Sequence, residues 1–207
     1  SRFFQTFSFS FTEPWLGGEK PVQFSSSISQ TKQFLYNPAT RDADKSRNFN
    51  ITGLTLGIAK KLSVPDDYFV LSQAISFQYY DLNNYNTGLF TFGNGNSNNL
   101  AYTVGLSRNN SFNDPIYPIG GSSFNLSAKF SFPYSAVSDV DYSELKNERD
   151  AQYDIIAQYA NSNNAEEIGL RNTASERIGE IDQLRYKWLE FYKVKFKMYY
   201  ILKIKNQ

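Results

Sequence analysis

The sequence predicts an all-β protein: a segment of an antiparallel transmembrane β-barrel with about seven strands. Three observations predict it. Seven segments alternate apolar and polar residues, short and long links follow one another in strict turn, and aromatic residues gather at segment ends. Outer-membrane barrels have short periplasmic turns and longer extracellular loops, so the order of the links also predicts an orientation. Residues 1–207 are expected to form part of one barrel domain.

The seven segments have about the length of membrane-crossing strands. They span residues 3–15, 21–36, 49–60, 68–81, 99–109, 122–132 and 188–203. Short links are predicted at residues 16–20, 61–67 and 110–121, and long links at residues 37–48, 82–98 and 133–187. Proline and glycine within or beside the short links, such as Pro14 with Gly17 and Gly18, supply the chemistry of tight turns.

In the first three segments the apolar side chains share one face, because successive residues of a strand point to opposite faces. The apolar residues are Phe7, Phe9 and Phe11, then Val22, Phe24 and Ile28, then Leu54, Leu56 and Ile58. The residues between them are mostly Ser, Thr and Gly, and such small polar residues suit a concave, hydrated interior.

The next three segments continue the pattern, the fourth less regularly. Their apolar residues are Phe69, Leu71, Ile75 and Phe77, then Leu100, Tyr102, Val104 and Leu106, then Phe124, Leu126, Ala128, Phe130 and Phe132.

The seventh segment alternates large apolar residues with Lys193, Lys195 and Lys197. Three lysines on one face need water, so we expect a lumen-facing cationic patch. It is either a solvated inner wall or a surface that guides a client or an ion.

Two of the long links carry further expectations. The loop at 83–99 is rich in Asn and Gly and is expected to be mobile. The link at 133–187 is expected to be a long extracellular insertion with helices near 142–159 and 175–188. There are two interpretations of this insertion. It is a solvated extracellular insert, or it forms a docking surface or a lid over the barrel mouth.

Composition excludes several classes of function. The balance of 21 basic and 20 acidic residues gives no support for nucleic-acid binding. Without Cys or His, disulfides, thiolate metal sites and the usual catalytic triads are excluded, and no nucleotide-binding or hydrolase motif occurs. We therefore expect no enzyme, no cofactor and no metal site. Residues 1–15 lack the features of a signal peptide, so an exported form would be mature or a fragment.

A soluble antiparallel sandwich would show the same alternation of apolar and polar residues. The link order and the small polar residues favour a membrane barrel instead. The barrel is also favoured by an aromatic girdle, which would comprise Trp15, Tyr36, Tyr68, Tyr79, Tyr80, Phe132, Tyr134 and Trp188.

Two stretches resemble a known family. Residues 9–18, Phe-Ser-Phe-Thr-Glu-Pro-Trp-Leu-Gly-Gly, are similar to a strand-to-turn segment of the BamA family, the central subunit of the outer-membrane β-barrel assembly machinery. Residues 113–123 resemble a later turn of that family, although Ile119 stands where the family has Thr. The matching turn residues are Glu13, Pro14, Trp15, Gly17, Gly18, Asp114, Tyr117, Pro118, Gly120 and Gly121.

The resemblance implies strands four to ten of a 16-strand barrel in the bacterial outer membrane, preceded by POTRA domains. An odd number of strands also indicates a piece of a larger barrel, since bacterial single-chain barrels have even counts. The implied function is to fold and insert outer-membrane proteins, with nascent β-barrel proteins, accessory subunits of an assembly complex and outer-membrane lipid as partners. A two-partner-secretion or autotransporter-assembly barrel, or a passive porin, are the alternatives.

Overall fold

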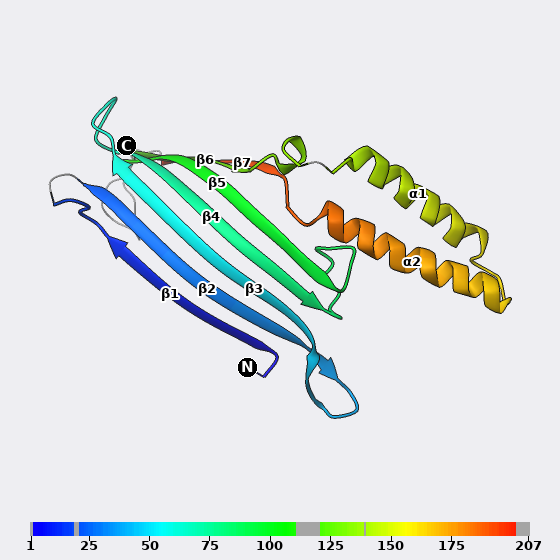
Figure 1. The fold of residues 1–207 in the computed structure, drawn as a ribbon. Helices are drawn as coiled ribbons and strands as arrows, with labels where there is room; N and C mark the ends of the chain where they lie inside the picture. Colours follow the sequence, from blue (N-terminus) through cyan, green and yellow to red (C-terminus); the bar gives the residue numbers. More distant parts are fainter. Residues whose placement is uncertain (1, 19–20, 111–120, 139, 202–207) are drawn as a thin grey trace, which may run out of the picture.

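The seven predicted strands form one antiparallel sheet in a computed structural model that describes residues 2–18, 21–110, 121–138 and 140–201. The strands are β1 (Phe4–Glu13), β2 (Val22–Asn37), β3 (Asp42–Lys61), β4 (Phe69–Asn83), β5 (Gly95–Asn109), β6 (Gly121–Ser131) and β7 (Tyr192–Ile201). Each strand pairs with the next along the chain (Figure 1). Within the described residues β1 and β7 each pair on one side only, so the sheet is open.

The pairing register separates the two faces of the sheet. Leu56 on β3 is opposite Ile75 on β4, which is opposite Tyr102 on β5, and all three lie on one face. This apolar face is strongly exposed: Phe9 retains 69% of its accessible surface and Phe196 retains 65%. Small residues cover the other face, which we call the polar face. There an added Cβ on Gly57 would lie 2.8 Å from the Ser25 hydroxyl oxygen.

The hairpin between β2 and β3 is tighter than the sequence indicated. Residues 42–48, predicted as part of a long link, belong to β3, and only residues 38–41 form the turn. In that turn the Ala39 amide donates to the Asn37 side chain over 2.9 Å, and Arg41 adopts a positive φ of 53°. The charged residues at the start of β3 were read as a loop. They fit a strand here because the end of this hairpin is solvated. The predicted strict alternation of short and long links is therefore wrong at this position.

The insertion between β6 and β7 contains the short helix η1 (Tyr134–Ala136) and the helices α1 (Tyr142–Gln158) and α2 (Ala165–Arg185). Asp141 and Asn164 accept hydrogen bonds from the first backbone amides of α1 and α2, which explains where each helix begins. The prediction of two helices is confirmed, although α2 begins ten residues before the predicted start at 175. The helices lie side by side and extend away from the sheet (Figure 1). No helix in the described part of the chain is both long and apolar enough to cross a membrane.

The largest buried cluster lies on the polar face, at the end of the sheet where the β4–β5 link is found. It consists of Phe49, Leu82, Tyr85, Phe90 and Phe92. Three of these aromatic residues come from the link at 84–94, which the sequence predicted to be mobile. These three aromatic residues are buried against β3 and β4, so they attach the link to the sheet.

Candidate functional site: a cationic groove on the polar face

A groove of about 630 Å³ lies on the polar face of strands β4 to β7. Its floor includes Asn99 and Thr103 from β5 and Ser127 from β6, and its cationic side is formed by Lys129, Lys193 and Lys195. Its apolar rim comes from Leu89 in the β4–β5 link and from Leu189 and Phe191, which precede β7. A volume of this size is typical of ligand sites in proteins.

The strand register brings the lysines together. Lys193 on β7 is directly opposite Lys129 on β6, and Lys195 and Lys197 follow on the same face of β7. Like charges directly opposite each other destabilise a strand pair, so this arrangement carries a cost. Lys129 offsets part of it, since its ammonium nitrogen lies 5.6 Å from the centre of the Phe191 ring. Among the described residues that line the groove there is no carboxylate to neutralise the lysines.

A hydrogen-bonded network fixes the polar side chains at one end of the groove. The Gln78 carbonyl oxygen accepts from the Tyr80 hydroxyl over 3.0 Å and from the Asn99 amide nitrogen over 3.2 Å. Tyr80 also packs against the aromatic cluster described above. It was predicted in the aromatic girdle, but its register with Ile51 and Ser97 places it on the polar face. The girdle prediction is therefore wrong for Tyr80.

Buried Asp182 joins the insertion to the β4–β5 link. Its side chain is 1% exposed and accepts a hydrogen bond from the Thr91 hydroxyl over 2.6 Å. Guanidinium nitrogens of Arg149 on α1 and Arg185 on α2 lie 3.3 Å and 3.6 Å from its other oxygen. A buried carboxylate needs such partners, because taking a charge out of water is costly. The network thus fastens both helices to the segment that forms the groove rim.

The return from α2 to the sheet is also fixed. The Leu189 amide donates to the Asn98 carbonyl over 2.8 Å, and the Asn98 amide donates to the Lys187 carbonyl over 2.8 Å. Trp188, predicted in the seventh strand, precedes that strand and stacks on Tyr134 with ring centres 4.1 Å apart; both residues were predicted in the aromatic girdle. The seventh strand begins at Tyr192, four residues after the predicted start at 188.

The first family-like turn lies away from the groove, at the opposite end of the sheet. The Glu13 carboxylate accepts from the Trp15 amide over 3.2 Å, and the Gly18 amide donates to the Trp15 carbonyl over 2.9 Å. Gly17 and Gly18 have φ values of 81° and 76°. Glycine adopts such positive φ angles without steric cost, which explains why glycine occupies both positions. Pro14 lies in the same turn, directly after β1.

The second family-like turn lies largely outside the described residues. Asp114, Tyr117, Pro118 and Gly120 fall there, and Gly121 begins β6 with a φ of 111°.

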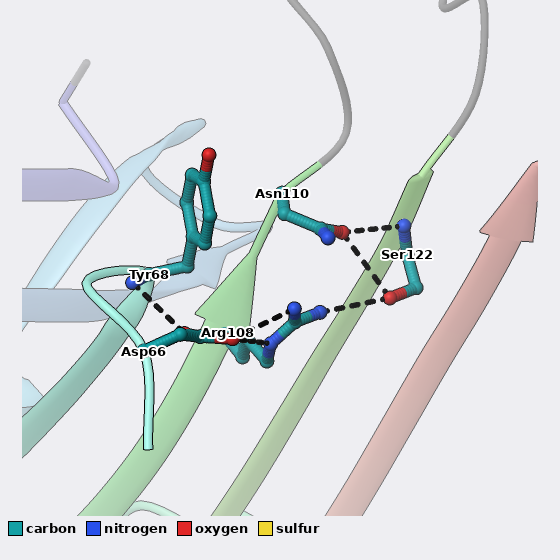
Figure 2. Close-up of polar contacts among 5 residues, drawn as sticks. All are labelled: Asp66, Tyr68, Arg108, Asn110 and Ser122. Atoms are coloured by element: carbon teal, nitrogen blue, oxygen red, sulfur yellow. Dashed lines mark hydrogen bonds and ion pairs between the residues drawn. The ribbon is translucent and has the colours of Figure 1, made fainter. Parts of the chain in front are cut away.

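A second polar cluster lies at this same end of the sheet, near the β3–β4 link (Figure 2). Two guanidinium nitrogens of Arg108 bind one Asp66 oxygen, at 2.9 Å and 2.8 Å, and a third donates to the Ser122 hydroxyl over 3.0 Å. Asn110 accepts from the backbone amide of Ser122 over 2.8 Å. Burial acts to raise the pKa of the Asp66 carboxyl, but hydrogen bonds from Arg108 and the Tyr68 amide outweigh it and leave this pKa below its usual value.

Sequence reasoning found three of the lysines but missed their partners. Lys129 sits among Ser and Asn residues of β6, so its place opposite Lys193 depends on the β6–β7 register. For Asp182 the sequence indicated only a position in a helical segment. The burial of its carboxylate depends on Arg149 and Thr91, which lie 33 and 91 positions away along the chain. No group of three or more Asp and Glu residues in the described ranges could hold a metal ion.

Comparisons with models of protein families, with curated proteins and with solved structures found no match to this chain.

Proposed function

We propose that this chain is part of the barrel wall of an outer-membrane assembly factor, which folds and inserts β-barrel proteins into the bacterial outer membrane. The observation that carries the proposal is the pair of turn sequences at residues 9–18 and 113–123 that resemble the BamA family. The sheet supports it, because the β1–β2 and β5–β6 links that contain these sequences lie at the same end.

The length of the apolar face along the strands supports a position in the membrane. Leu100 and Arg108 lie on this face of β5, and the eight residue-to-residue steps from one to the other span about 27 Å along a strand. A strand tilted by about 40° would cover about 21 Å of the membrane normal, close to the apolar band of about 25 Å in outer-membrane barrels. Polar residues follow at both ends of the face, with Asn50 bonded to Asp81 at one end and Arg108 bonded to Asp66 at the other.

The resemblance implies a mechanism without ATP or covalent chemistry. A family member opens between its first and last strands and offers an unpaired edge to which a client strand hydrogen-bonds. A short apolar belt disturbs the nearby bilayer and eases insertion. By the matched turns, strands β1 to β7 would be the wall between these gate strands, and the α1–α2 insertion would lie on the extracellular side.

Depletion of the complete protein tests the proposal. We expect folded, heat-modifiable outer-membrane proteins to decline together, and a plasmid copy of the wild-type gene to restore them. A passive porin is the main alternative, favoured by the polar face. Its loss would lower the uptake of small solutes and leave the assembly of other barrel proteins unchanged, and that result would reject the assembly function. The flanking sequence gives an independent check: POTRA repeats upstream and an Arg-Gly-Phe motif downstream are expected.

A further inference from the structure

We propose that the groove on the polar face binds an extended, acidic polypeptide segment whose carboxylates occur at alternate residues. The inference concerns the groove itself and does not depend on the assembly function proposed above.

The spacing of the lysines favours an extended ligand. Lys193 and Lys195, which line the groove, are alternate residues of β7, so their Cα atoms are separated by about 7 Å. Lys197 continues the row beyond the groove to a length of about 14 Å, with its ammonium nitrogen 5.1 Å from the centre of the Tyr199 ring. Alternate residues of an extended peptide have the same spacing, so each lysine can meet one carboxylate of such a peptide. A small anion would contact only one end of this row.

The charge of the groove favours an anionic ligand. Lys129 adds a fourth ammonium group opposite Lys193, and Glu190, the nearest acidic residue along the chain, is bonded to Ser135 in the insertion. Carboxylates of a bound segment would relieve the repulsion between Lys129 and Lys193. Ion pairs in a partly enclosed site are also screened less by salt than those on an open surface.

The walls of the groove favour a polypeptide. Leu89 and Leu189 supply apolar contacts beside the lysine row, and Thr103 and Ser127 supply hydroxyl groups on the floor. A peptide presents carboxylates, apolar groups and backbone amides together, and it can use all three kinds of contact. The lysine side chains project from the polar face and not from the edge of β7, so the ligand would lie across the side chains of this face.

Binding to the complete protein in detergent micelles tests the inference. The probe is a short fluorescent peptide of alternating Glu and Ser, and the matched peptide has the same composition with its Glu residues consecutive. We expect the alternating peptide to bind more tightly, and its affinity to fall as salt is raised. The double variant K193Q/K195Q should weaken binding about fivefold to tenfold, the sum of two partly exposed ion pairs.

The control variant is Lys146→Gln, which removes one charge from an exposed position on α1. It should leave the dissociation constant unchanged, and a heat-modifiable band on electrophoresis shows that each variant is folded. Equal affinity for the two peptides, or unchanged binding by K193Q/K195Q, would overturn the inference. Tighter binding of pyrophosphate or of a short oligothymidylate would also overturn it, and would assign the groove to small anions or to nucleic acid.

Discussion

Replacing Leu56 with arginine should destabilise the protein far more than the same change at the adjacent Thr55. Leu56 lies on the apolar face and is 44% exposed, between Ser26 on β2 and Ile75 on β4. Thr55 lies on the polar face between Ser27 and Ser76, which leave room for a longer side chain. If the apolar face contacts lipid, only the first substitution places a charge in hydrocarbon.

The depth of Leu56 sets the size of the effect. It is in register with Tyr102 through Ile75, two residues along β5 from Val104 at the centre of the apolar face, which corresponds to about 5 Å along the membrane normal. An arginine near the bilayer midplane costs roughly 2 to 4 kcal/mol. Leu126 is opposite Leu106, which is also two residues from Val104, so Leu126→Arg should likewise cost roughly 2 to 4 kcal/mol. Thr55→Arg should cost less than about 1 kcal/mol.

Reversible unfolding in urea, with the complete protein in lipid vesicles, measures these differences. The decisive result is that Leu56→Arg and Leu126→Arg are both clearly less stable than Thr55→Arg, which stays nearest to wild type. If Leu56→Arg and Thr55→Arg unfold at the same urea concentration, the apolar face does not contact lipid. The soluble sandwich would then be the better explanation of the alternating pattern.

Four further predictions concern other parts of the chain. A cysteine at Asn94 should react with an impermeant reagent on intact cells and one at Glu19 should not; labelling at Glu19 alone would invert the orientation. Replacing residues 137–180 with a Gly/Ser linker should leave a heat-modifiable barrel, whereas loss of that band would mean that the insertion is a structural element of the sheet. In Asp182→Asn, amides of the 84–94 link should exchange hydrogen faster while those of β3 stay protected, and unchanged exchange would show that the carboxylate does not fasten the link. Because the Asp66 pKa is lowered on folding, its contribution to stability is present above its unfolded pKa of about 4 and is lost as pH falls through the lower folded value. Asp66→Asn should remove this part of the acid sensitivity, and an unchanged pH profile of unfolding would contradict the ion pair with Arg108.

The sequence by itself determined the strands and their faces. Alternation with a period of two is a local property of an extended chain, so Phe124, Leu126 and Phe130 could be assigned to one face without knowledge of any partner. The helical segments of the insertion were likewise visible from local patterns. The start of β3 at Asp42 was missed because a charged hairpin that projects into solvent has no apolar face to mark it as a strand.

The tertiary structure decided which residues meet across strands and loops. Burial of Phe90 in a link that looks polar depends on its contact with Tyr80, whose ring centre lies 5.6 Å away, and no local pattern predicts that packing. The groove likewise depends on register: Lys129 and Lys193 lie on strands separated by the whole insertion, and a shift of one residue would place one of them on the apolar face. Long-range pairing therefore created the candidate site from residues whose local sequence showed only that they face water.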